Sequence, residues 1–333
     1  MKTVPNKEPA PAPPLVSVGV LTYNHEEYIA QALDSILMQE TDFPVEIVVG
    51  EDCSQDGTRD IVRKYAAQYP DRIRALLHEE NLGVNGNACA VRAACSGKYL
   101  AMLDGDNYWT CPHKLQKQVS FLEEHPEFIG SAHKVRVVDR FGELSRETYY
   151  AMHCDDAVYT LHHAEIGMLP GQMGTWVFRN VFRDFTPEQH RLYKECASVG
   201  DSKMALMLSL YGDFYCHREV MSAFRLITDG KSFSSRSYTE NLSLSYIHWA
   251  EERERLAKEA FGRDVDFTIV KQDAAYHAFV ALAKHPSINN AKIFAEAMRL
   301  QSDKARAWQR IMTQGLHVFS RRRRNERLSP SAR

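Results

Sequence analysis

The sequence predicts an α/β fold in which a mostly parallel β-sheet is flanked by helices and followed by a helical C-terminal extension. A strand-like apolar run followed by a segment of helical spacing recurs through residues 15–127, and residues 240–320 contain helical segments only. Apolar residues make up 44% of the 333 residues, which is enough for a large core without disulfides.

The first strand is expected over residues 15–22, a β-branched apolar run. A helix is expected over 26–39, where Ile29, Leu33 and Ile36 recur at helical spacing. The same alternation predicts three more strand and helix pairs, at 45–49 and 58–69, 73–77 and 85–95, and 98–103 and 113–124. In such sheets a ligand site is expected at the carboxyl ends of the strands.

The rest of the chain is less regular. We expect a β-like stretch at 129–138, an extended segment at 174–179 and a helix at 201–211. This half of the chain is expected to complete the sheet and to build the acceptor side. Residues 1–14 contain five prolines and no apolar run typical of a signal peptide, so we expect a disordered lead-in. Seven cysteines without a CxxC pair are typical of a cytoplasmic protein with reduced thiols.

Charge is unevenly distributed, although the net charge is only −2. Residues 301–333 carry nine Lys or Arg against two acidic residues, which gives +7, and residues 1–300 therefore carry −9. This distribution argues against general nucleic-acid binding and for one localised electrostatic contact.

The sequence Asp104-Gly105-Asp106 directly follows an expected buried strand. Glycine lets the backbone approach closely, and two carboxylates suit a hard cation such as Mn²⁺ or Mg²⁺ that also binds phosphate oxygens. Asp and Gly are also common turn formers, so this tripeptide alone is a weak signal.

Several segments together resemble the family 2 glycosyltransferases of the GT-A fold. They are VSVGVLTYNHEEYIAQALDSILMQ, EIVVGEDCSQDGT, NLGVNGNACAVRAACSGKYLAMLDGDNYW and KLQKQVSFLEEHPE, in the family's order and spacing. The resemblance implies a GT-A catalytic domain over 15–239, with a nucleotide-sugar half (15–127), an acceptor half (128–239) and a helical extension with a basic tail (240–333).

The resemblance also implies donor contacts from the loops after the strands. The implied nucleotide-sugar contacts are Thr22, Tyr23, Glu27, Asp52, Asn81, Asn87 and Asp104. Asp104 and Asp106 match the metal-associated motif, with Asp106 preferred as the direct ligand. Other interpretations remain open, namely a solvated loop carboxylate for Asp52 and a helix-entry turn for Asn81 and Gly83; for Asp56 and Thr58 helix capping is preferred.

The acceptor half contributes further candidates by the same resemblance. Asp201, in Gly200-Asp201-Ser202, matches the family's general base, although a helix N-cap is an equal alternative; Asp155, Asp156 and Glu195 are weaker candidates. Thr175 and Trp176 match the acceptor side, although core packing is the commoner fate of a lone Trp.

The chain departs from the family pattern at three places. Asn107 stands where Asp is frequent, the acidic pair after the second strand is Glu51-Asp52, and FRLITDGKSFSS lacks the usual histidine. These departures bear on strict metal dependence.

The basic tail predicts a helix whose apolar face carries Trp308, Ile311, Met312, Leu316 and Phe319. Residues 304–324 would either contact an anionic membrane surface peripherally or dock on the protein.

The predicted activity is transfer of a sugar, with inversion, from a nucleotide-diphosphate donor to a hydroxyl of a saccharide or lipid-linked acceptor, in cell-surface polysaccharide biosynthesis. The alternatives are a sugar-nucleotide-binding protein without transferase activity and a nucleotidyltransferase. The latter would need a glycine-rich phosphate loop after the first strand, where Thr22 to His25 contain none.

Overall fold

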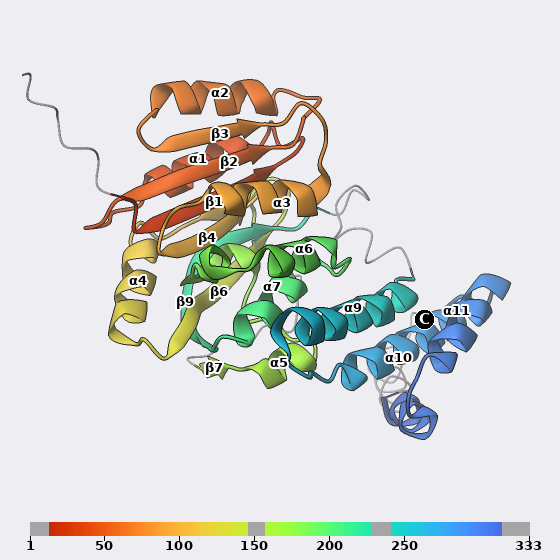
Figure 1. The fold of residues 1–333 in the computed structure, drawn as a ribbon. Coiled ribbons are helices and arrows are strands. Elements are labelled where there is room, and N and C mark those ends of the chain that lie inside the picture. The colour runs from red at the N-terminus through yellow and green to blue at the C-terminus, as the bar shows by residue number, and fades with distance from the viewer. Residues whose placement is uncertain (1–12, 146–156, 228–240, 315–333) are drawn as a thin grey trace, which may run out of the picture. The chain divides into compact units, whose positions relative to one another are not determined.

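A computed structural model describes residues 13–145, 157–227 and 241–314 of the chain. They divide into two compact units, coloured along the chain in Figure 1. The first, here called the sheet unit, comprises Met1–Tyr159, Pro170–Phe185 and Gly212–Arg225, and the remaining segments form the helical unit. The expected lead-in at 1–14 and the expected boundary at 239/240 lie largely or wholly outside the described residues.

The sheet unit is built on a nine-stranded mixed sheet with the order β3-β2-β1-β4-β8-β6-β9-β5, in which β7 also pairs with β9. Strands β1 to β4 pair in parallel, whereas β8, β5 and β7 pair antiparallel to their neighbours. The predicted α/β fold class is confirmed. The strands are β1 (Val16–Thr22), β2 (Val45–Glu51), β3 (Ile73–Leu77), β4 (Tyr99–Asp104), β5 (Tyr108–Trp109), β6 (Phe128–Val138), β7 (Ala157–Tyr159), β8 (Val177–Arg179) and β9 (Asp213–Arg225).

Helices cover both faces of the parallel strands. Val16, Val18 and Val20 of β1 point to one face, where they share a buried core with side chains of α1, α2 and α4. The helices of this unit are α1 (Ile29–Leu37), α2 (Thr58–Gln68), α3 (Gly83–Ala94) and α4 (Lys114–Glu124), with short 3₁₀ turns η1 (Met173–Thr175) and η2 (Val181–Asp184).

The other face of β1 and β2 is covered by α3, which packs unusually close to the strands. A Cβ atom at Gly19 would stand 2.7 Å from Val91 Cγ1, and one at Gly50 would collide with Asn87. Glycine at these two positions therefore lets α3 approach the sheet, and the loop before α3 is brought to the carboxyl ends of the strands.

The helical unit contains two buried apolar clusters of its own. Leu206, Ala250, Ala257 and Phe267 form one, and the other includes Ile247 and Ile311. Its helices are α5 (Leu161–Glu165), α6 (Pro187–Glu195), α7 (Gly200–Ser209), α9 (Ser243–Phe261), α10 (Thr268–Lys284) and α11 (Ile288–Arg299), followed by helical residues 304–314. The helical extension predicted after residue 240 is confirmed within the described residues.

The predicted apolar face of the tail helix is only partly correct. Ile311 is 1% exposed and packs inside the helical unit, whereas Trp308 and Met312 are 45% and 59% exposed. Arg310 forms an ion pair with Asp273, with 2.5 Å between Nε and Oδ1. Leu316, Phe319 and the arginines after them lie outside the described residues.

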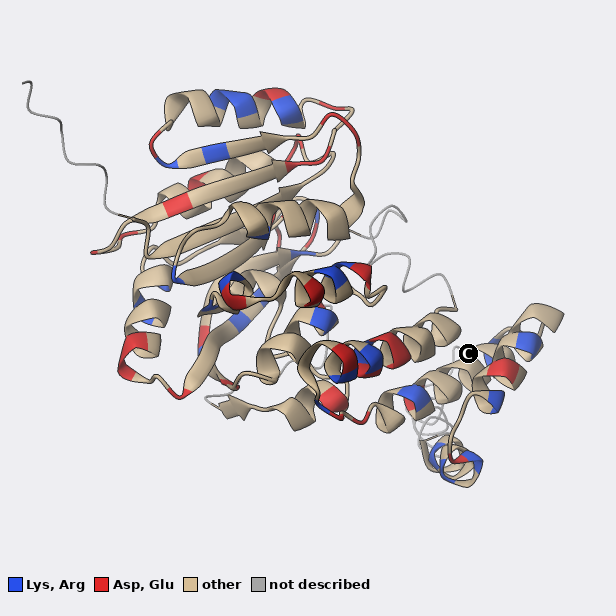
Figure 2. Ribbon diagram, viewed as in Figure 1, with Lys and Arg blue, Asp and Glu red and all other residues tan. Residues whose placement is uncertain are grey.

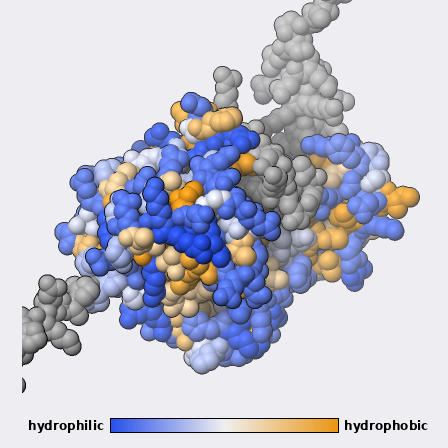
Figure 3. Space-filling model, turned by 90° about the horizontal axis from the view of Figure 1, so that it is seen from above, coloured by the Kyte–Doolittle hydropathy of each residue, from blue (hydrophilic) through white to orange (hydrophobic). Residues whose placement is uncertain are grey.

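The surface is largely polar where the structure describes it. Acidic and basic residues alternate along α9 (Figure 2), where Arg255 pairs with both Glu252 and Glu259. The face shown in Figure 3 is mostly hydrophilic, with small apolar patches. Within the described residues no helix combines the length and apolar character needed to cross a bilayer.

One lysine is buried in the sheet unit. Lys114, the first residue of α4, is 0% exposed, and its Nζ atom has no hydrogen-bond partner in the described part of the chain. The Nζ atom lies 4.3 Å from the centroid of the Trp109 ring. Burial lowers the pKa of Lys114 well below its usual value, so folding disfavours the charged amine.

We predict that Lys114→Met raises the free energy of unfolding near pH 7 by about 1–3 kcal/mol, because the buried amine loses its desolvation cost. The unfolded chain binds a proton at Lys114 that the folded chain binds less readily. Stability of the wild type therefore rises with pH towards the usual lysine pKa, and the advantage of the variant should shrink near pH 10. Denaturant unfolding at both pH values measures this difference.

The matched control is Lys64→Met, which replaces an exposed lysine on α2. It should change stability little at either pH. A loss of stability in Lys114→Met at pH 7 would contradict the prediction, because it would mean that the folded protein needs the charge.

Candidate functional site

The candidate site lies at the carboxyl edge of the parallel strands. The strand pairing aligns Thr22 with Glu51, Leu21 with Asp104, and Glu51 with Leu77. The loops that follow β1, β2, β3 and β4 therefore start at the same level of the sheet. This alignment gathers the polar side chains that the sequence places after each strand.

The acidic loop, defined as Asp104-Gly105-Asp106, is held against the end of β1. The Gly105 N–H donates to Leu21 O at 2.8 Å, and the Asn107 N–H donates to Asp104 O at 3.0 Å. A Cβ atom at Gly105 would stand 2.8 Å from Thr22 Oγ1 and 2.9 Å from His25 Nδ1. Glycine is thus required for the close approach of the loop to β1. Thr22, which is 2% exposed, packs against Gly105 on the protein side of the loop.

Burial dominates the electrostatics of the acidic loop. Desolvation raises the pKa of Asp104, and repulsion from Asp106 raises it further. Desolvation also raises the pKa of Asp106, while a backbone hydrogen bond and the Arg225 charge act in the opposite direction. The Oδ1 atom of Asp106 is buried and has no hydrogen-bond partner in the structure as described. Such a pair is costly to ionise without added positive charge.

A divalent cation fits this pair of carboxylates. Among the described residues there is no group of three or more His, Cys, Asp or Glu side chains that would form a complete cage. Mg²⁺ and similar cations are commonly held by one or two carboxylates together with substrate phosphates and water. His25, next to the loop, adds no competing charge near neutral pH, because burial lowers its pKa to about 4 against the opposing influence of Asp56.

The loops after β1 and β2 are joined by crosswise hydrogen bonds. Two residues in left-handed backbone conformations, Asn24 (φ 55°) and Cys53 (φ 60°), shape their turns. The donor and acceptor pairs are Asn24 N to Ser54 Oγ, Gln55 N to Asn24 Oδ1, His25 N to Thr58 Oγ1, Glu26 N to Asp56 Oδ2 and Gly57 N to Glu26 Oε2. Each loop thus satisfies backbone groups of the other.

Some side chains of these loops bind the protein's own backbone, whereas others are exposed to solvent. Asp56 Oδ1 accepts from the Thr58 N–H at 3.0 Å, but the N-cap residue of α2 is Gly57, so neither Asp56 nor Thr58 is the N-cap residue that the preferred interpretation made them. Tyr23 is 39% exposed. Glu27 Oε2 lies 3.5 Å from Arg140 Nη2 in a half-exposed ion pair. Tyr23 and Glu27, which follow β1 in sequence, therefore present accessible groups.

Asp52 and Asn81 meet where the loops after β2 and β3 come together. Asp52 Oδ1 accepts from the Leu82 N–H at 2.7 Å, and Asn81 Nδ2 donates to Asp52 O at 3.0 Å. Asn81 Oδ1 accepts from the Gly83 N–H at 3.0 Å, and Gly83 has a φ of 70°. The helix-entry turn at Asn81 and Gly83 is therefore present, and it fixes the carboxylate of Asp52. Asp52 is 3% exposed, so it is not a solvated loop carboxylate.

Glu51 and Asn87 are engaged within the protein. The Glu51 carboxylate accepts from Ser54 N at 2.6 Å and from Arg59 Nε at 2.5 Å. Asn87 is 3% exposed, its Nδ2 donates to Gly50 O at 2.9 Å, and its Oδ1 lies 3.1 Å from His78 Nε2. Asn87 therefore bridges β2 to the loop after β3, and both ends of its side-chain amide are engaged within the protein.

The structure also corrects the assignment of Thr175 and Trp176 to acceptor contact. Both are 0% exposed. Trp176 Nε1 donates to Gly171 O at 3.0 Å, and the indole packs edge-on against Phe214. Thr175 Oγ1 donates to Gln172 O at 2.7 Å. Core packing, the alternative for Trp176, is what the structure shows.

Asp201 belongs to the helical unit and lies in the first turn of α7. The N-cap residue of α7 is Val199, and no side-chain hydrogen bond caps this end, so Asp201 is not the N-cap. Glu195 forms an exposed ion pair with Arg191, with 2.6 Å between Oε2 and Nη1. Asp155 and Asp156 lie outside the described residues.

Sequence reasoning missed Arg225, the last residue of β9. Arg225 is 4% exposed, and its backbone N–H donates to Asn107 Oδ1 at 2.8 Å. Asn107 thus links the end of β9 to the acidic loop through its amide oxygen. The sequence shows Phe224-Arg225 as an aromatic residue followed by an arginine. It does not show that Arg225 contacts residues more than 80 positions away.

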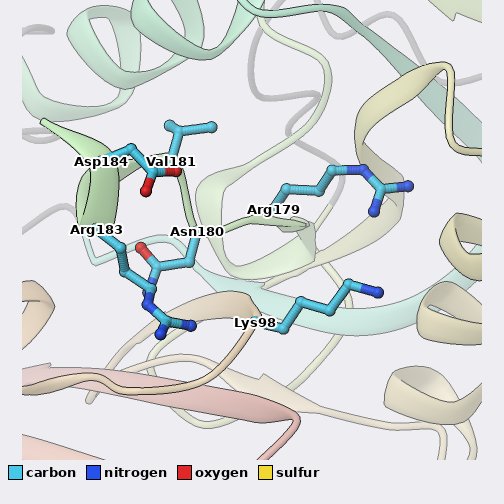
Figure 4. A pocket seen from close by; sticks show the side chains of 6 residues that line it. All are labelled: Lys98, Arg179, Asn180, Val181, Arg183 and Asp184. Atoms are coloured by element: carbon cyan, nitrogen blue, oxygen red, sulfur yellow. The ribbon is translucent and has the colours of Figure 1, made fainter.

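A pocket of about 500 Å³ lies at the opposite, amino edge of the sheet, where Lys98 precedes β4. Lys98 and Arg179 extend to one side of it, and Arg183 lies beside Asn180 (Figure 4). Arg179 already donates to Phe128 O at 3.0 Å, and Lys98 pairs with Glu123 at 2.7 Å. These cations support the fold, and the pocket lies away from the acidic loop.

Comparison with known proteins agrees with this geometry. Residues 17–182 match the model of the family described as Glycosyl transferase family 2. An uncharacterised protein of Mycobacterium tuberculosis is 45% identical over 132 residues, which is 40% of this chain and 38% of that protein. The putative teichuronic acid biosynthesis glycosyltransferase TuaG of Bacillus subtilis is 41% identical over 113 residues, or 33% of this chain and 43% of TuaG.

Solved structures share the fold over more of the chain. A crystal structure of TarS from S. aureus covers 85% of this chain and 78% of that chain, with a TM-score of 0.57 and 21% identity. A further TarS structure, with the same TM-score, is in complex with UDP-GlcNAc. The chain spans less than half the length of the curated relatives named above. Its family match, motifs and GT-A type fold together show that the chain belongs to glycosyl transferase family 2.

Proposed function

We propose that this glycosyltransferase moves a sugar, with inversion, from a nucleotide-diphosphate donor to a hydroxyl group of a saccharide or lipid-linked acceptor. The observation that carries the proposal is the acidic loop, in which the buried Asp106 Oδ1 atom has no hydrogen-bond partner among the described residues. Two desolvated carboxylates at the carboxyl edge of a nucleotide-binding type of sheet suit a cation and a diphosphate.

The donor contacts that we propose are Tyr23, Glu27, Asp52 and Asn81. Asp52 keeps its second carboxylate oxygen for a base N–H or a ribose hydroxyl, because Leu82 and Asn81 bind its other polar groups. Tyr23 is exposed enough to pack on a ring. We place Thr22 and Asn87 behind the site as supports of its loops.

We propose Asp106 as the principal ligand of Mn²⁺ or Mg²⁺, with Asp104 beside it. When bound, such a cation supplies positive charge to the leaving diphosphate. Support comes from the donor set, since carboxylate oxygens suit these hard cations and the described residues offer no competing thiolate or imidazole cage.

For the displacement we propose Asp201 as the general base. The acceptor hydroxyl oxygen bonds to the anomeric carbon, its proton passes to the Asp201 carboxylate, and the bond from the anomeric carbon to the diphosphate oxygen breaks. The match of Gly200-Asp201-Ser202 to the family's general base supports this role, and Asp201 lies in the first turn of α7.

The setting that we propose is cell-surface polysaccharide biosynthesis, supported by the similarity to TuaG, a putative teichuronic acid biosynthesis glycosyltransferase. A lipid-linked acceptor would lie at a membrane surface. We therefore propose peripheral contact through residues 304–324, supported by exposed Trp308 and Met312 and by the basic composition of the tail.

Asp106→Asn should lower transfer by at least about a hundredfold, because it removes the charge of a metal ligand while keeping the shape of the side chain. The measurement is release of nucleoside diphosphate in a screen of nucleotide sugars with Mn²⁺, alongside a thermal melt to show that the fold is intact. Asp71→Asn, at an exposed position before β3, is the matched control. An unchanged rate in Asp106→Asn would remove this residue from the mechanism.

Asp201→Asn should lower turnover by about 10²- to 10⁴-fold with little change in donor affinity or melting temperature, because only proton removal is lost. Single-turnover kinetics and equilibrium donor binding separate these effects. Glu195→Gln provides a carboxylate control on α6. Retained turnover with lower thermal stability would assign Asp201 to helix stabilisation.

Replacing Trp308 and Met312 together with Ala should reduce binding to anionic vesicles, because these exposed side chains would enter the lipid interface. Co-sedimentation with phosphatidylglycerol vesicles is the measurement, and phosphatidylcholine vesicles should bind less of the wild type. Val84→Ala removes an exposed apolar side chain from α3 as control. Equal binding to both vesicle types by the wild type would contradict the electrostatic part of this contact.

A further inference from the structure

We propose that Arg225 is a positioning residue that holds the acidic loop in its donor-binding geometry from the end of β9. This inference rests on the proposed function, because it assigns to Arg225 the support of the proposed cation ligands. It concerns a residue that lies more than a hundred positions away from that loop in the sequence.

The guanidinium group of Arg225 binds the acidic loop directly. Arg225 Nε donates to Asp106 O at 3.0 Å. The backbone N–H of the same residue donates to Asn107 Oδ1 at 2.8 Å. Asp106 of the acidic loop and Asn107, which follows it, are thus both bound to one residue of β9, while the Gly105 N–H donates to Leu21 O of β1.

The remaining donors of Arg225 fasten it to two other segments. Nη2 donates to Gln31 Oε1 of α1 at 2.7 Å, and Nη1 donates to the carbonyl oxygens of Asp139 and Arg140 at 3.2 and 2.9 Å. All of these acceptors are neutral oxygens. The planar fork of Arg225 therefore serves as a rigid junction between the loop, α1 and the turn after β6.

Two aromatic rings enclose the guanidinium group. Its central carbon lies 4.5 Å from the ring centroid of Tyr28 and 5.6 Å from that of Tyr108. Tyr28 precedes α1, and Tyr108 begins β5 directly after the acidic loop. With 4% exposure, Arg225 has little freedom to turn, so the position of Asp106 is fixed by contacts that need no ligand.

Lysine cannot reproduce this junction. An ammonium group presents its three donors from one point, whereas Arg225 directs separate nitrogen atoms to three segments of the chain. Arg225→Lys keeps the charge and most of the apolar stem, so it tests the geometry of the fork and not the presence of a charge.

Arg179 offers a matched control in the same unit. Its guanidinium group also binds backbone carbonyls, at Phe128 O (3.0 Å) and Leu122 O (2.6 Å), and it lies over the Tyr99 ring. It stands at the amino edge of the sheet, beside β4's first residue. Arg179→Lys should therefore cost stability without affecting the acidic loop.

The experiment measures binding of Mn²⁺ by electron paramagnetic resonance, with UDP and, in separate titrations, GDP as probes. Arg225→Lys should weaken Mn²⁺ binding by about ten- to a hundredfold, the range typical of residues that orient metal ligands. Arg179→Lys should bind as the wild type does. Thermal melts of both variants are expected to fall by similar amounts, which separates loop positioning from general stability.

A second readout is the metal dependence of transfer. Saturating Mn²⁺ should restore most of the turnover of Arg225→Lys, because its carboxylates are intact, and should not restore Asp106→Asn. Wild-type affinity in Arg225→Lys, or equal weakening in both arginine variants, would overturn the proposal. Failure of the wild type to bind Mn²⁺ with either nucleotide would instead refute the proposed function.

Discussion

The constraint that governs this site is the desolvation of two half-buried carboxylates on one short loop. Desolvation raises the pKa of both aspartates, and repulsion from Asp106 raises the pKa of Asp104 further, whereas the Arg225 charge lowers the pKa of Asp106. The fold nevertheless holds the loop tightly, through Leu21 on one side and Arg225 on the other. Backbone contacts therefore hold the loop in a fixed geometry. In the proposed function, a bound divalent cation neutralises its negative charge.

The sheet explains how so many loops serve one place. Parallel register brings the ends of β1, β2, β3 and β4 to one level, and glycines at 19 and 50 let α3 approach closely enough to complete the edge. Within that frame the polar residues divide by whether their groups are satisfied. Glu51 and Asn87 hold the loops, whereas Tyr23, Glu27 and Asp52 are the side chains that we propose for contact with the donor.

Much of the parallel half could be predicted from the sequence, because apolar periodicity and turn residues are local signals. The strands at 45–51 and 73–77 and the helix at 58–68 lie within two residues of their expected bounds. The long strand β9 was not predicted as an element, and the contacts of Arg225 depend on pairing across the sheet that no local pattern records. The burial of Trp176 follows from packing against Phe214, which is likewise nonlocal.

The crosswise bonding of the loops after β1 and β2 has a consequence for how such a site diverges. Glu26 and Asp56 each satisfy a backbone N–H on the other's loop, as do Asn24 and Ser54. Neither loop has a complete set of hydrogen bonds without its partner. Exchanging only one of these loops with that of a homologue would therefore leave backbone groups of the other loop without partners. A change of donor preference through these loops would require both segments to change together.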